Sequence, residues 1–106
     1  MSNLSISDTS YRNEENIEKI SLFFKIFSES TRLKIILYIL EKPECIVNDI
    51  VNALNIAQPI VSHHLHVMES FNIIHMKREG RIKKCYVKNP DKIKKIIELS
   101  KDFISK

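Results

Sequence analysis

The chain has 106 residues, of which 43% are hydrophobic and 28% charged, so it fits one soluble globular domain and not two independent cores. The chain has no long apolar run, which excludes a membrane span and a signal peptide. Two cysteines are too few for a disulfide scaffold, and one glycine is too few for a Gly-rich phosphate loop. We expect a cytoplasmic protein. The net charge of +4 is uneven. Residues 1–76 carry six basic and nine acidic residues and residues 77–106 carry eleven and four, which suggests a polyanionic partner for the C-terminal part.

The first predicted elements are a tail and a helix. Residues 1–13 are polar and show no period, which indicates a flexible N-terminal tail before a single domain of residues 14–106. Between Glu14 and Phe27 apolar residues recur at steps of three and four, which predicts an amphipathic helix. Its acidic first turn suits the positive end of the helix dipole.

A second helix follows closely. Ser28 or Ser30 is suited to cap its start, because a serine hydroxyl can accept a hydrogen bond from a free N–H of the first turn. Pro43 ends it, since the residue before a proline is disfavoured in a helix. We expect its buried face to consist of Leu33, Ile36, Leu37 and Leu40.

Two unequal helices joined by a short turn come next. The first is expected over Val47–Leu54 and the second over Gln58–Ser70, with Pro59 in the first turn, where its missing N–H costs little. The turn between them is Asn55-Ile56-Ala57. This is the helix-turn-helix arrangement, whose second helix can lie in the major groove of DNA.

The period then changes from helical to alternating over residues 74–87, with Gly80 between the two runs, which predicts a β-hairpin. A last helix opens at Asn89-Pro90-Asp91. The fold class is therefore mainly α with a small β-hairpin, a winged helix-turn-helix with the order of four helices, two strands and a fifth helix.

Two sets of side chains point to double-stranded DNA as the partner. Polar side chains suited to base edges and phosphates, together with one apolar residue suited to a thymine methyl, lie on the outward face of the helix from Gln58: Gln58, Ile60, Ser62, His63 and His66. Cations suited to phosphates crowd the hairpin: Lys77, Arg78, Arg81, Lys83 and Lys84. A solvated polar helix face and a lysine-rich edge strand are the plainer alternatives.

Three segments together resemble the ArsR/SmtB family of bacterial winged-helix repressors. Residues 24–35 look like its opening signature, residues 58–65 like its recognition helix, and residues 78–81 followed by Tyr86 like its wing. The resemblance covers about residues 15–105 in the right order. It implies a sequence-specific transcriptional regulator, a repressor on a palindromic operator, and no enzyme.

The resemblance also implies a homodimer formed by the first and last helices. The apolar stripes that would meet the partner chain are Ile17, Ile20 and Phe24 on the first helix and Ile93, Ile97 and Ile104 on the last. A small winged core has little other use for them, although both helices could instead fold back on their own core. A dimer would place two recognition helices on two half-sites.

The family's metal sites are not filled. One uses a Cys-Val-Cys-Asp-like stretch, and the matching residues here are Ile46-Val47-Asn48-Asp49. The other pairs Asp with His on the last helix, and residues 90–106 contain no histidine. His63 and His66 could share a face, but DNA contact is their simpler role. His64 matches an inward-packing position of the family and is expected to be a hydrogen-bonded core histidine. We expect no metal and no cofactor.

Two alternatives remain open. A thiol-based redox regulator would use Cys45 or Cys85, but these do not match the second-helix and last-helix cysteines of the family's redox sensors, so two unconnected reduced thiols are favoured. An exposed Cys85 would have its pKa lowered by Lys83 and Lys84. The second alternative is a winged-helix module that binds another protein through its apolar terminal helices.

Overall fold

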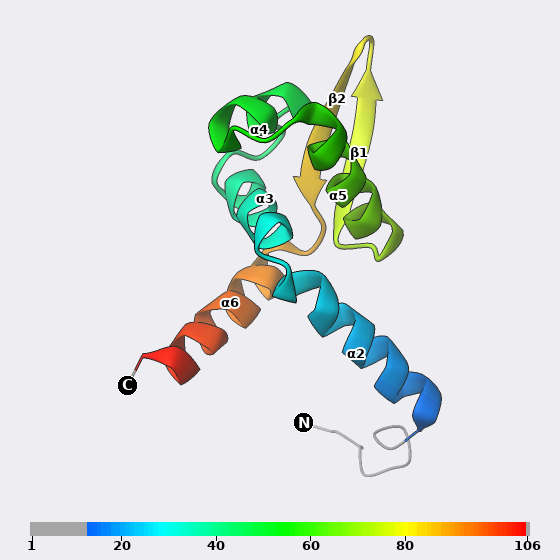
Figure 1. Ribbon diagram of the computed structural model, residues 1–106, viewed down its shortest axis with the longest axis vertical. Helices are drawn as coiled ribbons and strands as arrows, with labels where there is room; N and C mark the ends of the chain where they lie inside the picture. Colours follow the sequence, from blue (N-terminus) through cyan, green and yellow to red (C-terminus); the bar gives the residue numbers. More distant parts are fainter. Residues whose placement is uncertain (1–12, 106) are drawn as a thin grey trace.

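A computed structural model describes residues 13–105 and confirms the winged helix-turn-helix fold (Figure 1). The elements in chain order are α2 (Glu14–Ser28), α3 (Ser30–Glu41), α4 (Val47–Leu54), α5 (Gln58–Ser70), β1 (Ile74–Glu79), β2 (Ile82–Val87) and α6 (Pro90–Ile104). The tail expected at residues 1–13 lies outside the described residues except for Asn13. The side chain of Asn13 accepts hydrogen bonds from the backbone N–H groups of Glu15 and Asn16 and so caps α2.

The core is built from the four central elements. Its fully buried side chains come from α3, α4, α5 and the hairpin: Ile35, Ile36, Ile39, Ile50, Val61, Leu65, Met68, Ile74 and Cys85. Helix α3 lies at the centre and contacts α2, α4, α5 and β2. The hairpin is antiparallel and pairs Ile74 with Val87 at its base and Glu79 with Ile82 at its tip.

Two expectations for α3 were wrong. Its N-cap is Glu29, whose carboxylate accepts from the backbone N–H of Arg32 at 3.0 Å, and neither predicted serine has this role. Its buried face is centred on Ile35, Ile36 and Ile39, while Leu37 is 43% exposed. The reason is that α3 packs on several neighbours, so the residues around it, and not its own period alone, decide which side is inside.

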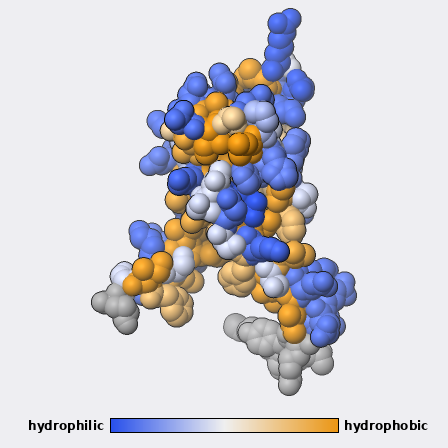
Figure 2. All heavy atoms as spheres, in the orientation of Figure 1, coloured by the Kyte–Doolittle hydropathy of each residue, from blue (hydrophilic) through white to orange (hydrophobic). Residues whose placement is uncertain are grey.

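Helices α3, α4 and α5 and the hairpin form the body of the molecule. The terminal helices α2 and α6, called the legs below, diverge from it (Figure 1). Each has a single buried residue, Ile26 in α2 and Ile93 in α6. Figure 2 shows apolar surface running along both legs in this view. Within residues 13–105, no helix combines the length and the apolar character that crossing a bilayer requires.

Candidate nucleic-acid interface

Helix α5 is the predicted recognition helix, called the reading helix below, and it presents the residues predicted to contact bases to solvent. Its inner stripe of Val61, Leu65 and Met68 is fully buried, which fixes the rotation of the helix on the body. The opposite face therefore points outward. On that face Gln58, Ile60, His63 and His66 are exposed and Ser62 is half-buried.

The wing is a tight hairpin with Gly80 at its tip. Gly80 is the first residue of a two-residue turn and has a φ of 66°, a left-handed conformation that glycine adopts without a steric cost. The side chain of Arg78 donates to the carbonyl oxygen of Gly80 at 3.5 Å. The cations at the tip are thus held on a short, defined turn.

The strand register divides the wing cations between two faces. Residues directly opposite in an antiparallel pair project to the same side, and successive residues alternate. Arg78 pairs with Lys83 on the side that carries the buried pair members Ile74 and Cys85, so these two cations continue the body-facing side of the wing. The pair of Lys77 and Lys84 lies on the other side.

Lys84 already has anionic partners within the chain. Its ammonium lies 3.2 Å from the carboxylate of Glu79 and 3.8 Å from that of Glu44. The hydrogen bond to Glu79 raises the pKa of Lys84 and so holds it in the charged form. Of the five wing cations predicted to meet DNA, Lys84 is therefore the least available, because its charge is balanced inside the wing.

A cleft of about 470 Å³ joins the reading helix to the wing. Gln58 and Ser62 of α5 line it together with Arg78, Arg81 and Lys83 of the wing. Ile46 and the first residues of α4, Val47 and Asn48, also line it; the sequence placed these residues at the position of a metal site and did not assign them to DNA. Two groups of residues that are separated along the chain thus converge on one concave, cationic surface.

Arg32 of α3 makes hydrogen-bond contacts with both the end of α2 and helix α5. Its Nε donates to the carbonyl oxygen of Ile26 at 2.9 Å, and its Nη1 lies 3.3 Å from Nδ1 of His64 on α5. Because arginine can only donate, Nδ1 accepts and the ring is neutral. Burial lowers the pKa of His64, which favours the same neutral form. The hydrogen bond expected for His64 is found, with Arg32 as its partner, but the side chain is half-buried and does not belong to the buried core.

Glu29 completes this junction. The backbone N–H of Arg32 lowers the pKa of the Glu29 carboxyl by donating a hydrogen bond to it. An ionised Glu29 thus caps α3 beside Arg32 and His64. The three residues connect the end of α2, the start of α3 and the middle of α5, and so set the position of the reading helix.

The residues predicted for the dimer interface differ in how exposed they are in one chain. On α2, Ile17, Ile20 and Phe24 are 50%, 47% and 60% exposed. On α6, Ile104 is 78% exposed, but Ile93 is 5% exposed and Ile97 is packed against the core. The prediction for Ile93 needs correction, because the first turn of α6 packs on the body and buries this residue within one chain. Ile97 is half-buried, and its place in a dimer interface stays a prediction.

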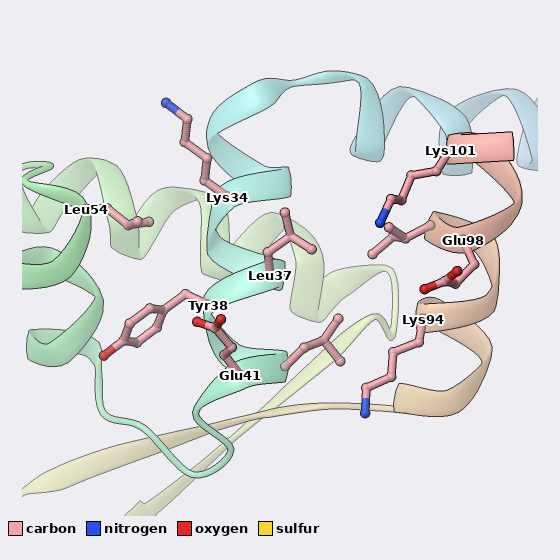
Figure 3. Close-up of a pocket in the computed structure, with 10 residues that line it drawn as sticks. Lys34, Leu37, Tyr38, Glu41, Leu54, Lys94, Glu98 and Lys101 are labelled. Carbon is pink, nitrogen blue, oxygen red and sulfur yellow. The ribbon is translucent and has the colours of Figure 1, made fainter. Parts of the chain in front are cut away.

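A second cleft, of about 730 Å³, lies between α3 and α6 (Figure 3), and none of the residues that line it belongs to the wing. Ile97 lines it together with Leu37 and Tyr38 of α3. Glu98 and Lys101 extend from α6 toward α3 across the gap (Figure 3). This cleft explains why Leu37 is exposed within one chain.

The two cysteines are neither exposed nor separate, which corrects the expectation of unconnected thiols. Cys85 is fully buried and Cys45 is 7% exposed. The backbone N–H of Cys85 donates to the carbonyl oxygen of Cys45 at 2.8 Å, and the neighbouring Cys45 thiol and burial raise the pKa of Cys85. Cys85 is therefore not the exposed thiol whose pKa Lys83 and Lys84 would lower. Among residues 13–105 no group of three or more His, Cys, Asp or Glu side chains is arranged to hold a metal ion.

Comparisons with known proteins agree on one family. Residues 29–75 match the model of bacterial regulatory proteins of the arsR family. The chain is 34% identical over 85 residues to an uncharacterized HTH-type transcriptional regulator of Methanocaldococcus jannaschii, across 80% of this chain and 94% of the relative. It is 32% identical over 84 residues to the cadmium resistance transcriptional regulatory protein CadC of Listeria innocua, across 79% and 70%.

A solved structure shares the fold. The homodimeric winged helix-turn-helix DNA-binding domain of Mb0332 from Mycobacterium bovis, a possible ArsR-family regulator, superposes with a TM-score of 0.74 at 16% identity. The match covers 93% of this chain and 91% of that one. At this identity the likeness is one of architecture.

Proposed function

Because this chain belongs to the ArsR family of helix-turn-helix transcriptional regulators, we propose that it is a repressor that binds a palindromic operator as a homodimer. Its family and fold are those of transcriptional regulators and not of enzymes. The observation that carries the proposal is the cleft in which the start of α5 meets the cationic side of the wing.

Helix α5 and the wing make different kinds of contact with DNA in this proposal. An outward Gln58 suits adenine, because its amide can donate and accept at one base edge, and Ile60 suits the methyl group of thymine. Arg78, Arg81 and Lys83 of the wing bind phosphates beside the groove, which fixes the register of α5 without reading sequence. Ser62, His63 and His66 add contacts along the outward face of α5.

The homodimer is supported by the exposed apolar stripes of the legs. Phe24 on α2 and Ile104 on α6 are more than half exposed, which a soluble chain avoids unless the surface meets a partner. A second copy is the simplest partner, since a two-fold axis lets the same stripes cover each other. Two wings and two α5 helices then face one side, as a palindrome requires.

The test is DNA selection from a random duplex pool with the purified protein, followed by binding to the selected duplex at several salt concentrations. We expect an inverted repeat with half-sites about one helical turn apart. Two chains should bind per duplex. The affinity should fall steeply as salt rises, because the lysine and arginine side chains release the counterions that are bound to the DNA phosphates. A protein that recovers no motif and shows no salt dependence would contradict the proposal.

A further inference from the structure

The segment before α4 is joined to the wing by a single β-bridge. Ile46 forms an antiparallel bridge with Lys84 of β2, which places Cys45 opposite Cys85 in the same register. The backbone N–H of Cys85 donates to the carbonyl oxygen of Cys45 at 2.8 Å, and that of Glu44 donates to the carbonyl oxygen of Cys85 at 3.2 Å. The two cysteines are therefore held face to face by backbone bonds, although they lie far apart along the chain.

Residues that face each other in an antiparallel pair are close enough along the backbone for a disulfide to join them. Residues opposite each other across an antiparallel hydrogen bond have Cα atoms about 5.5 Å apart, within the range of about 4.4–6.8 Å that disulfides span. The two side chains lie on the same side of the paired backbone segments, because residues opposite each other in an antiparallel pair project to the same face. Their closure needs no unfolding of the body.

The two thiols differ in chemical character. The neighbouring Cys85 thiol lowers the pKa of Cys45, against the opposing effect of burial, while the Cys45 thiol and burial raise the pKa of Cys85. Cys45 is also the one with exposed surface, at 7% against 0%. A small oxidant that reaches this site therefore meets Cys45 first, and Cys45 is the better nucleophile of the two.

We propose that Cys45 and Cys85 form an oxidation site that closes to an intramolecular disulfide in the presence of a peroxide, and that this closure weakens DNA binding. The second part rests on the proposed function, whereas the first part does not. The site differs from a lone cysteine because both sulfurs are positioned by the same backbone bridge.

The chemistry is balanced with hydrogen peroxide as the oxidant. The Cys45 thiolate attacks one peroxide oxygen, the O–O bond breaks, and hydroxide leaves, which gives a sulfenic acid on Cys45. The sulfur of Cys85 then attacks the Cys45 sulfur, the S–O bond breaks, and the departing hydroxide takes the Cys85 proton as water. Two electrons pass from the two sulfurs to the peroxide, and a thiol reductant reverses the change.

The position of the site connects it to the DNA face. Cys45 directly precedes α4, the first helix of the helix-turn-helix, and Cys85 lies on β2, two residues from Lys83 in the cleft. Closure links β2 covalently to the start of α4, so the wing can no longer adjust its position relative to α5. The wing cations then lose the freedom to fit the phosphates beside the groove.

The first experiment counts thiols in the folded, full-length protein with and without hydrogen peroxide and maps peptides without reduction. Both thiols should disappear together, Cys45 and Cys85 should appear in one linked peptide pair from a single chain, and a thiol reductant should restore them. Thiols that persist, or cross-links between chains, would overturn the proposed site. DNA is absent from this arm, so its outcome is independent of the proposed function.

The second experiment compares DNA affinity of the oxidised and reduced forms for wild type, Cys45→Ser, Cys45→Ala and Cys85→Ala, each checked for folding by circular dichroism. Wild type should bind about tenfold more weakly when oxidised, a loss on the scale of one charged contact, and the variants should not respond. Equal affinity of both wild-type forms, or an equal loss in folded variants, would overturn the regulatory part. Failure of reduced wild type to bind any duplex would instead refute the proposed function.

Discussion

The body of the molecule and its two legs use apolar residues in opposite ways. Helices α3, α4 and α5 bury their inner stripes within one chain, and the surface on the wing side carries polar and cationic side chains together with the exposed Ile60. Helices α2 and α6 each bury one residue and leave Phe24, Leu99 and Phe103 among the exposed side chains. The chain thus has one surface for a polyanion and another for apolar association, and the two are spatially separate (Figure 1).

The largest effect is expected on the legs. Phe24→Asp places a charge in the apolar stripe of α2, twice per dimer, and should raise the dissociation constant of the dimer by at least about 100-fold, as loss of a buried aromatic anchor does. Sedimentation velocity over a concentration series measures it. The matched control is Leu22→Asp, since Leu22 is 41% exposed but lies on the opposite side of α2. Equal effects of both variants would contradict the assigned stripe.

The next effect belongs to the body. Reversing both members of one cross-strand pair, Arg78→Glu with Lys83→Glu, should weaken binding to every duplex about equally, by about 100-fold at low salt, because phosphate contacts carry no sequence information. Fluorescence anisotropy with selected and scrambled duplexes measures it. The dimer should persist in this variant, and a monomeric variant would show that the two surfaces are not separate.

A smaller effect is expected on the outward face of α5. His63→Ala should change the preferred base at one position of each half-site, with a discrimination of about 1–3 kcal/mol for a good base contact, while affinity for non-specific DNA changes little. Repeating the DNA selection with the variant reads this out directly. An unchanged motif would remove His63 from the reading face.

The smallest effect is a pH dependence of stability. Burial lowers the pKa of His64, so the unfolded chain binds the proton more readily than the folded one. His64 should therefore destabilise the fold as the pH falls below about 6.5, the ordinary value for histidine, and have no such effect above it. Urea unfolding from pH 7.5 to pH 5 tests this. His64→Asn, whose amide oxygen can still accept from Arg32, should lose this part of the dependence.

Local signals in the sequence predicted most of the fold. Pro59, Gly80 and the apolar periods are local features, and the bounds expected for Val47–Leu54 and Gln58–Ser70 agree with the structure. The outward face of α5 followed from its inner stripe, since a helix with one buried side has a defined exposed side.

Features that depend on non-local packing were missed. The contact of Cys45 with Cys85 depends on the bridge between Ile46 and Lys84, which no local pattern encodes. The place of Ile93 in the protomer core depends on how far α6 follows the body before it departs. Likewise, the pairing of Lys84 with Glu79 and Glu44 required the register of three backbone segments.

In the proposed complex, DNA contacts the body-facing side of the wing together with α5. The most direct test is the salt dependence of DNA affinity for Lys83→Ala and Lys77→Ala, which remove the same charge from opposite sides of the wing. For a dimer, Lys83→Ala should reduce the slope of log affinity against log salt by about two, one phosphate contact per chain, and Lys77→Ala should leave it near that of wild type. Equal slopes for the two variants would contradict the account.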